Sequence, residues 1–424
     1  MQKKLKIFQF NEVNFDLVKE YIYKGQLQNF KYFLKKYNYI ETESEKKYEN
    51  LEPWIQWVSF YTGKTYEEHK IFYLNDDRNN NWSFYNELEN KYKKKMALLF
   101  QMNLKNSFTK ETFFIPDPWT ETEIHTDPKT KKLFYSLQKI ILQNASNKIS
   151  FKDFWIISSF SLFNTSLSFK MFIIKNFVKI LRYKFYKAII FDRLCWELFK
   201  KSKEVQNSDV SSLFLNACAH IQHHYFLNSI TKNVKKNPSW YIDNIDPVFE
   251  CLKVYDFILG ELKEFKNIEF LIATGLSQTP VKEPIFYYNL KNPELFFKEL
   301  GITYYKISKR MSRDYTLEFE SDESALENLK KLEDIKLNSL KFFNLKLKRS
   351  KIFLELGYEK EINSDDQLLT QNKSNIFIKN KLNFIAIKNT IHNAKGYLLS
   401  SIKDFDKPIN ISEINQIILK QYEK

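Results

Sequence analysis

Short apolar runs alternate with amphipathic segments along most of the chain. The runs at residues 4–10, 96–102, 211–218 and 268–273 have the length and composition of buried strands. Apolar positions at helical spacing predict helices at residues 15–23, 27–37, 53–61, 82–95, 247–265, 293–300 and 323–335. Residues 112–129 hold three prolines and predict an ordered loop. Strands that alternate with helices predict an α/β fold, with a largely parallel sheet between helical layers.

Residues 150–205 break this alternation. They are apolar, aromatic and basic, they contain no glycine or proline, and residues 154–169 carry no charged side chain. That uncharged stretch is too short and too rich in serine to span a membrane. We expect a helical aromatic and basic insertion here, between a first part of the core domain at 1–149 and its remainder at 206–424. A peripheral membrane or oligomer contact through residues 150–200 is the alternative.

Composition narrows the class of protein. The chain has 424 residues, of which 43% are hydrophobic and 17% aromatic, and this excludes a disordered protein. The net charge of +15 comes almost entirely from lysine, which favours a solvated surface that attracts small anions over a specific nucleic-acid site. Cys195, Cys218 and Cys251 are scattered among apolar residues. We therefore expect reduced thiols and, with no signal peptide pattern at residues 1–10, a cytoplasmic location.

Three of the six histidines lie within five residues, directly after the predicted strand at 211–218. His220 and His224 are spaced i, i+4, so a helix would place both imidazoles on one face, where they could share a metal ion. Ligands at the carboxyl end of a strand suit an α/β protein. Surface or capping roles are the alternative for this pair, and His223 is expected to support the site rather than to bind the metal.

Four segments in order resemble the alkaline phosphatase superfamily, especially its type I phosphodiesterase and nucleotide pyrophosphatase-like branch. These are residues 6–18 (KIFQFNEVNFDLV), 53–72 (PWIQWVSFYTGKTYEEHKIF), 220–224 (HIQHH) and 392–397 (HNAKGY). The resemblance implies an alkaline-phosphatase-like fold and a divalent metal, with zinc favoured, held by His220, His224 and His392. Three imidazoles would leave a fourth zinc position open.

The chain also departs from the pattern of that superfamily. Asn11 stands where the resemblance implies a metal-binding aspartate, with Glu12 beside it, and Thr274-Gly275 stands where it implies an aspartate-histidine pair. No serine, threonine or cysteine occurs between Lys46 and Val58, where the nucleophile would lie. Direct attack by water activated at one metal is then expected, with Glu52 or Glu12 as general base. Capping of the helix at 53–61 is the alternative role for Glu52.

The resemblance favours a diverged metal-dependent hydrolase of phosphodiester, phosphate or sulfate esters. Trp119 and Gln278 are candidates for the substrate pocket, and the partner would be a small anionic ester. The missing nucleophile supports a second hypothesis, in which the chain is a catalytically inactive binding protein. A third hypothesis is a transferase that modifies cell-surface glycans.

Overall fold

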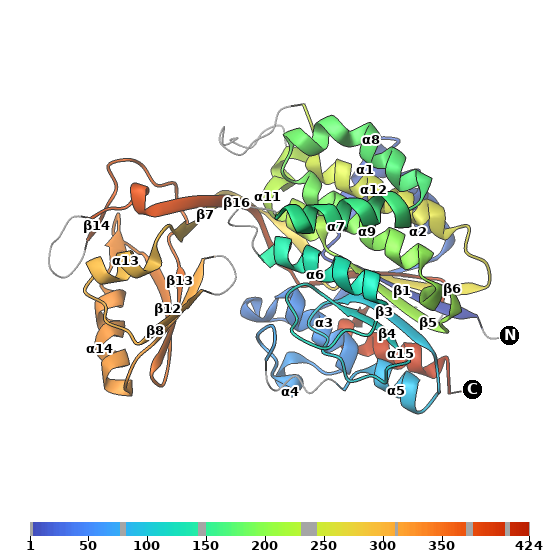
Figure 1. The fold of residues 1–424 in the computed structure, drawn as a ribbon, viewed down its shortest axis with the longest axis horizontal. Helices are drawn as coiled ribbons and strands as arrows, with labels where there is room; N and C mark the ends of the chain where they lie inside the picture. The colour runs from blue at the N-terminus through green and yellow to red at the C-terminus, as the bar shows by residue number, and fades with distance from the viewer. Residues whose placement is uncertain are drawn as a thin grey trace. The chain divides into compact units, whose positions relative to one another are not determined.

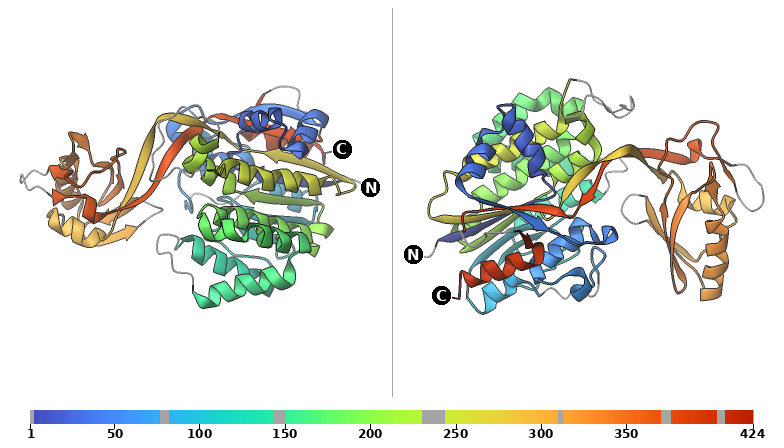
Figure 2. Two further views of the ribbon diagram at one scale, coloured as in Figure 1. Left: turned by 90° about the horizontal axis from the view of Figure 1, so that it is seen from above. Right: turned by 180° about the vertical axis from the view of Figure 1, so that it is seen from behind.

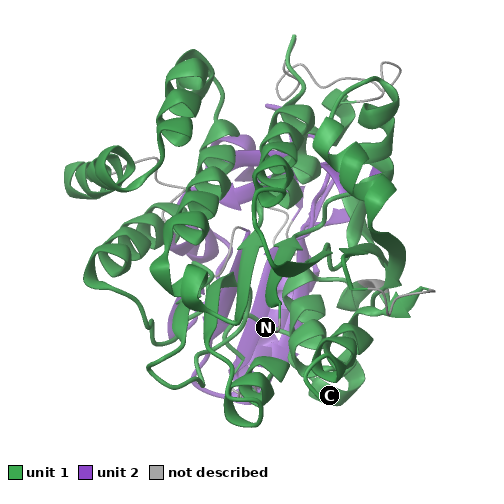
Figure 3. Cartoon of the chain, turned by 90° about the vertical axis from the view of Figure 1, so that its right-hand side faces the viewer, with its two compact units in different colours: residues 1–233, 242–279, 391–424 green, residues 234–241, 280–390 purple. Residues whose placement is uncertain are grey.

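The computed structural model describes residues 3–76, 82–142, 150–229, 244–309, 313–369, 376–402 and 408–423. The chain forms two compact units, which Figure 3 colours separately. Unit 1 holds residues 1–233, 242–279 and 391–424, and unit 2 holds residues 234–241 and 280–390. Each unit is described by itself below.

Unit 1 is built on an eight-stranded sheet with the order β18-β2-β17-β6-β1-β5-β3-β4. Its strands are β1 (Lys4–Phe10), β2 (Asn38–Glu43), β3 (Met96–Gln101), β4 (Phe113–Pro116), β5 (Val210–Leu215), β6 (Ile268–Ala273), β17 (Lys395–Ser400) and β18 (Ile409–Asn410). β1 pairs in parallel with β5 and β6, and β17 is antiparallel to both of its neighbours. All the other pairs in this sheet are parallel. The predicted α/β class and largely parallel sheet are confirmed.

Helices cover both faces of this sheet. In Figure 1, α9 and α12 lie on one side of the strands, while α3, α5 and α15 lie on the other. The helices of unit 1 outside residues 150–207 are α1 (Phe15–Tyr23), α2 (Gln28–Lys36), α3 (Pro53–Thr62), α4 (Tyr66–His69), α5 (Phe84–Asn90), α6 (Pro128–Leu142), α11 (Ala217–Ser229), α12 (Pro247–Leu262) and α15 (Ile414–Lys420). Short 3-10 turns occur at Tyr48–Asn50 and Ile411–Glu413. Figure 2 shows the same layers from two further sides.

Residues 151–207 form four consecutive helices. They are α7 (Phe151–Asn164), α8 (Leu167–Arg182), α9 (Tyr186–Lys201) and α10 (Lys203–Asn207). α9 packs on β5 and carries the buried side chains of Trp196 and Phe199. Among the described residues, no helix combines the length and the apolar character that crossing a membrane requires.

Residues 113–116 lie within the segment expected to be a loop, but they form the edge strand β4. All four residues are buried, and the strand pairs in parallel with β3. Pro116 ends this strand, where the missing amide hydrogen of proline removes no hydrogen bond from the sheet interior.

Unit 2 has its own apolar core, centred on Phe297, Tyr315 and Phe342. From the sequence, these residues were expected to belong to the remainder of the core domain at 206–424. The strands are β8 (Lys306–Lys309), β9 (Asp314–Glu318), β10 (Lys336–Leu337), β11 (Leu340–Lys341), β12 (Phe343–Lys348), β13 (Lys351–Leu356), β14 (Gln367–Leu369) and β15 (Ile376–Phe377), and the helices are α13 (Pro293–Glu299) and α14 (Asp322–Glu333). A 3-10 turn occurs at Lys379–Lys381. The chain leaves unit 1 through β7 (Ser277–Leu290) and returns through β16 (Leu382–Asn393), and these two strands pair with each other.

Candidate metal centre

Glu12 lies just beyond the carboxyl end of β1, and hydrogen bonds to its backbone fix its position. It adopts a left-handed conformation with φ of 57°, which is unfavourable for a residue with a side chain. Its N–H donates to the carbonyl of Thr274 at 2.9 Å, and its carbonyl accepts from Gln222 Nε2 at 2.7 Å. These bonds, from segments after β6 and β5, fix the direction in which the carboxylate points.

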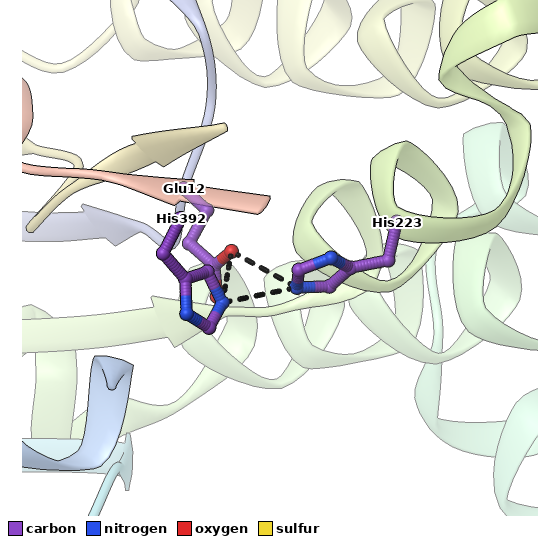
Figure 4. Close-up of side chains that lie close together, drawn as sticks. All are labelled: Glu12, His223 and His392. Atoms are coloured by element: carbon purple, nitrogen blue, oxygen red, sulfur yellow. Dashed lines mark hydrogen bonds and ion pairs between the residues drawn. The ribbon is translucent and has the colours of Figure 1, made fainter. Parts of the chain in front are cut away.

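Two histidines from distant segments meet this carboxylate, as Figure 4 shows. His223 lies on α11, the helix that follows β5, and His392 lies at the end of β16, just before β17. Glu12 Oε2 is 3.3 Å from Nε2 of His223 and 3.3 Å from Nε2 of His392. The two Nε2 atoms are 3.1 Å apart. All three residues belong to unit 1.

The cluster is buried at Glu12 and more open at its other members. The side chain of Glu12 is 2% exposed, that of His392 7% and that of His223 19%. Burial acts to raise the pKa of the Glu12 carboxyl, but the adjacent imidazoles of His392 and His223 outweigh burial and hold that pKa well below its usual value. Glu12 is therefore the anionic centre of this site.

Two buried amides complete the surroundings of Glu12. Gln278 Nε2 donates to Glu12 Oε2 at 2.5 Å and to the carbonyl of Ala219 at 3.0 Å. Asn11 Nδ2 donates to Glu12 Oε1 at 3.2 Å and to Asn216 Oδ1 at 2.7 Å. Both carboxylate oxygens thus have a donor, so the carboxylate is fixed in orientation as well as in place.

The three ligand atoms fit a tetrahedral metal ion. Bonds of 2.0–2.1 Å to zinc place two ligands of a tetrahedron about 3.3 Å apart. The observed separations of 3.1, 3.3 and 3.3 Å agree with that value. Glu12, His223 and His392 could therefore hold a metal ion. Two histidines and one glutamate form a ligand set of catalytic zinc sites, which keep a fourth position open.

Glu52 lies beside this set. It occupies the N-cap position of α3, but its side chain makes no capping hydrogen bond. Its Oε2 is instead 3.6 Å from Nδ1 of His392, the ring nitrogen that does not face Glu12. A carboxylate on this side of a histidine favours the tautomer whose other nitrogen can bind a metal.

The structure brings together only part of the set that the sequence suggested. His392 and Glu12 meet, whereas His220 and His224 are outside the group of ligand atoms found among the described residues. The rings of His220 and His224 do lie on one face of α11, with centroids 4.9 Å apart, and His220 is exposed. A signal for His223 was present in the sequence, because Ala219, Gln222, His223 and Phe226 form a stripe at i, i+3, i+4 and i+7.

Asn11 is engaged with other groups rather than aimed at an open position. Its Oδ1 accepts from the indole N–H of Trp57 at 2.8 Å, and its Nδ2 makes the two bonds given above. Trp57 is fully buried, and a Cβ added at Gly275 would lie 3.1 Å from its ring. The indole therefore fills the space between Asn11 and the Thr274-Gly275 turn.

The two expected pocket residues lie in different surroundings. Gln278 is fully buried against Glu12, as described above. Trp119 is partly buried in the loop after β4, where its N–H donates to Asp117 Oδ1 at 2.7 Å. On α3, the hydroxyl of Ser59 lies 3.1 Å from Nε2 of His69.

Comparisons with known proteins give structural matches alone, since no family model and no curated protein matches the chain. A phosphonoacetate hydrolase from Sinorhizobium meliloti 1021, solved with phosphonoformate, is 9% identical over 99% of this chain and 96% of that chain, with a TM-score of 0.43. A murine ectonucleotide pyrophosphatase/phosphodiesterase 5, an inactive variant with AMP, is 11% identical over 100% of this chain and 95% of that chain, with a TM-score of 0.43. An alkaline phosphatase from the Antarctic bacterium TAB5 is 8% identical over 100% and 99%, with a TM-score of 0.39.

Proposed function

We propose that the chain is a diverged, metal-dependent hydrolase of phosphodiester, phosphate or sulfate esters, related to the alkaline phosphatase superfamily. One divalent cation, with zinc favoured, is held by Glu12, His223 and His392. The observation that carries the proposal is the spacing of the three ligand atoms, at 3.1–3.3 Å from one another. All three residues also lie in segments that carry the sequence resemblance.

The chain's own groups define the chemistry available. A divalent cation at this position supplies Lewis-acid stabilisation of negative charge on an ester oxygen. Glu52 is about one-third exposed and lies on the outer side of His392, so it is placed to orient that imidazole or to accept a proton from an attacking water. The start of α3 offers no hydroxyl or thiol, and this favours direct attack by water over a covalent intermediate.

The charge of the protein suits an anionic substrate. The net charge of +15 is spread over many lysines, and a positive field raises the local concentration of phosphate or sulfate esters. Such a field favours substrates with negative charge, whatever their leaving group.

Metal analysis of the purified protein tests the ligand set. We expect about one equivalent of a divalent metal per chain, lost in His223→Ala and His392→Ala, because each change removes one of the three ligands. His220→Ala and His224→Ala are matched controls on the same helix and should retain the metal. Metal content that survives in His223→Ala, or is lost in His220→Ala, would contradict the proposed set.

Turnover separates the hydrolase from a binding protein. The zinc-loaded protein would be assayed with bis-p-nitrophenyl phosphate, p-nitrophenyl phosphate and p-nitrophenyl sulfate, with the His392→Ala variant as the blank. We expect at least one ester to be hydrolysed, with activity that follows metal content. Stoichiometric metal without turnover of any ester would favour the binding protein, a role consistent with the Trp57 indole that fills the region beside Asn11.

A further inference from the structure

α8 presents an apolar stripe to solvent. Leu167, Met171, Ile174, Val178 and Leu181 follow one another at spacings of four and three residues, and each is between 41% and 73% exposed. That spacing places all five on one face of the helix. We call these residues, with the adjacent and exposed Phe177, the α8 face. In Figure 1, α8 runs along the outer side of the helical layer.

The inner side of α8 packs into a small apolar core of unit 1. Phe169 is buried in a small core with Leu133, Leu137 and Leu194, and Ile173 packs against the same cluster. The α8 face is therefore not needed to attach the helix to unit 1. A helix with an apolar inner side usually turns polar residues outward, and here the outward side is apolar too.

α7 adds large aromatic side chains of the same character. Phe151, Phe154, Trp155 and Phe163 are all more than half exposed, and Trp155 has the indole N–H that suits a membrane–water interface. On its inner side, Ile157 and Phe160 pack against the same cluster as Phe169. The exposed apolar area thus extends over two consecutive helices.

Positive charge surrounds this apolar area. Between residues 151 and 191 the cationic side chains are Lys152, Lys170, Lys175, Lys179, Arg182, Lys184 and Lys187, whereas Asp153 is the one acidic residue of that stretch. Asp153 is paired with Lys139 at 2.9 Å, and Lys179 is paired with Glu250 at 3.1 Å. On the helical wheel, Lys170 borders the stripe on one side, and Lys175 and Arg182 border it on the other.

We propose that the α8 face and the exposed aromatic residues of α7 bind an anionic lipid surface, with the helices lying in the plane of the interface. Exposed apolar residues flanked by lysine and arginine are what such binding requires, because the apolar side chains enter the lipid boundary while the cations meet phosphate groups. Charge complementarity favours lipid over a second copy of the chain, since a symmetric contact between two α8 faces would bring the same cations against each other. The proposal stands independently of the metal centre.

Vesicle sedimentation of the full chain tests this surface. We expect binding to vesicles of equimolar phosphatidylcholine and phosphatidylglycerol, little binding to phosphatidylcholine alone, and a strong decrease in high salt. The pair Ile174→Ser/Val178→Ser should weaken binding by at least about tenfold. The pair Lys175→Gln/Arg182→Gln should weaken it by about 30-fold at low salt. Leu326→Ser is the control, because this leucine is also an exposed apolar residue on a helix, α14 of unit 2.

Folding and self-association are measured beside it. Circular dichroism should show unchanged helix content in both double variants, since the substituted side chains are exposed. Equal binding to neutral and anionic vesicles, or unchanged binding of both double variants, would overturn the proposal. A dimer seen by light scattering that Ile174→Ser/Val178→Ser dissociates, without vesicle binding by the unmodified chain, would assign the surface to a second copy and would also overturn it.

Discussion

Gln278 is the residue through which the proposed metal centre can be weakened without touching a ligand. Its Nε2 donates to Glu12 Oε2 at 2.5 Å and to the carbonyl of Ala219 on α11 at 3.0 Å. One amide thus links the glutamate to the helix that carries His223. Gln278→Leu keeps a side chain of similar length and removes both hydrogen bonds.

The size of the effect follows from these contacts. Loss of a hydrogen bond that orients a metal ligand typically lowers metal affinity 10- to 100-fold, which corresponds to about 1.4–2.8 kcal/mol. We expect the upper part of this range, because the bond is short, its acceptor is charged and both residues are buried. Leucine also leaves the polar groups of a fully buried position with one donor fewer, which costs about 1–3 kcal/mol of folding free energy.

The assay is competition for zinc against a chromophoric chelator, with urea unfolding of the metal-free protein measured in parallel. Gln101→Leu is the matched control. Gln101 is equally buried, and it accepts hydrogen bonds from Gln9 Nε2 and Ser212 Oγ. It should lose stability to a comparable degree and keep its metal affinity. If Gln278→Leu binds zinc as tightly as the unmodified chain, the assignment of Glu12 as a ligand fixed by Gln278 is refuted.

Three further predictions concern stability. Burial raises the pKa of Asp192 to about 6, above its unfolded value. The stability that this carboxyl contributes is therefore present below about pH 4 and is lost as pH rises toward 6, by about 3 kcal/mol. Urea unfolding across this range should show the decline in the unmodified chain and not in Asp192→Asn. Glu197→Ala should cost about 3–5 kcal/mol of unfolding free energy, because its arginine partner, 2.7 Å away, is also buried. Glu327→Ala, in the exposed pair of the same i, i+4 spacing, should leave the unfolding free energy nearly unchanged, and equal losses in the two variants would contradict this expectation. Gly396→Ala would place a Cβ 2.4 Å from a backbone carbonyl oxygen and should destabilise unit 1 by more than about 2 kcal/mol, and a thermal midpoint unchanged from the unmodified chain would show that the strands separate without strain.

The central strands of unit 1 could be predicted because they are buried on both faces. β1, β3, β5 and β6 are apolar through most of their length, and each predicted range lies within three residues of the observed strand. The strand next to the β18 edge of the same sheet carries no such signal. β2 reads NYIETE with one fully buried residue, and a half-polar segment of this kind cannot be told from a loop by periodicity.

Unit 2 could not be recognised as a separate unit from the sequence for a related reason. β7 contains Pro280 and Pro284 together with charged residues, a composition that argues against a regular strand. β16 alternates buried and exposed positions irregularly. The two strands stabilise each other through pairing, and a pairing between residues about a hundred positions apart leaves no trace in either local pattern.

From the sequence one could predict which segments contribute to the candidate site, but not which face of α11 points toward it. The sequence suggested His392 as a metal ligand and Glu12 as a general base, and the structure brings these two side chains together. On α11, one residue step rotates a side chain by about 100°, so the choice between His223 and its neighbours depends on which face of the helix lies against the sheet. In the structure Gln222 and Phe226 are buried and His220 is exposed, so the face with Gln222 packs against the protein. The sequence does not show which face of the helix packs in this way.

The surroundings of Glu12 argue for one cation rather than two. An aspartate at position 11 would place a second carboxylate oxygen where Asn11 Nδ2 now lies, 3.2 Å from Glu12 Oε1, and would lose the donor that Asn216 Oδ1 receives at 2.7 Å. Two carboxylates at that distance repel unless a further positive charge lies between them. The indole of Trp57 lies beside Asn11 and donates to its Oδ1, so the amide oxygen at position 11 is already engaged and is not directed at a second ion. The amide at position 11 and the tryptophan at position 57 therefore depend on each other through this hydrogen bond. Both are consistent with a centre in which Glu12 is the one carboxylate among the three ligand residues.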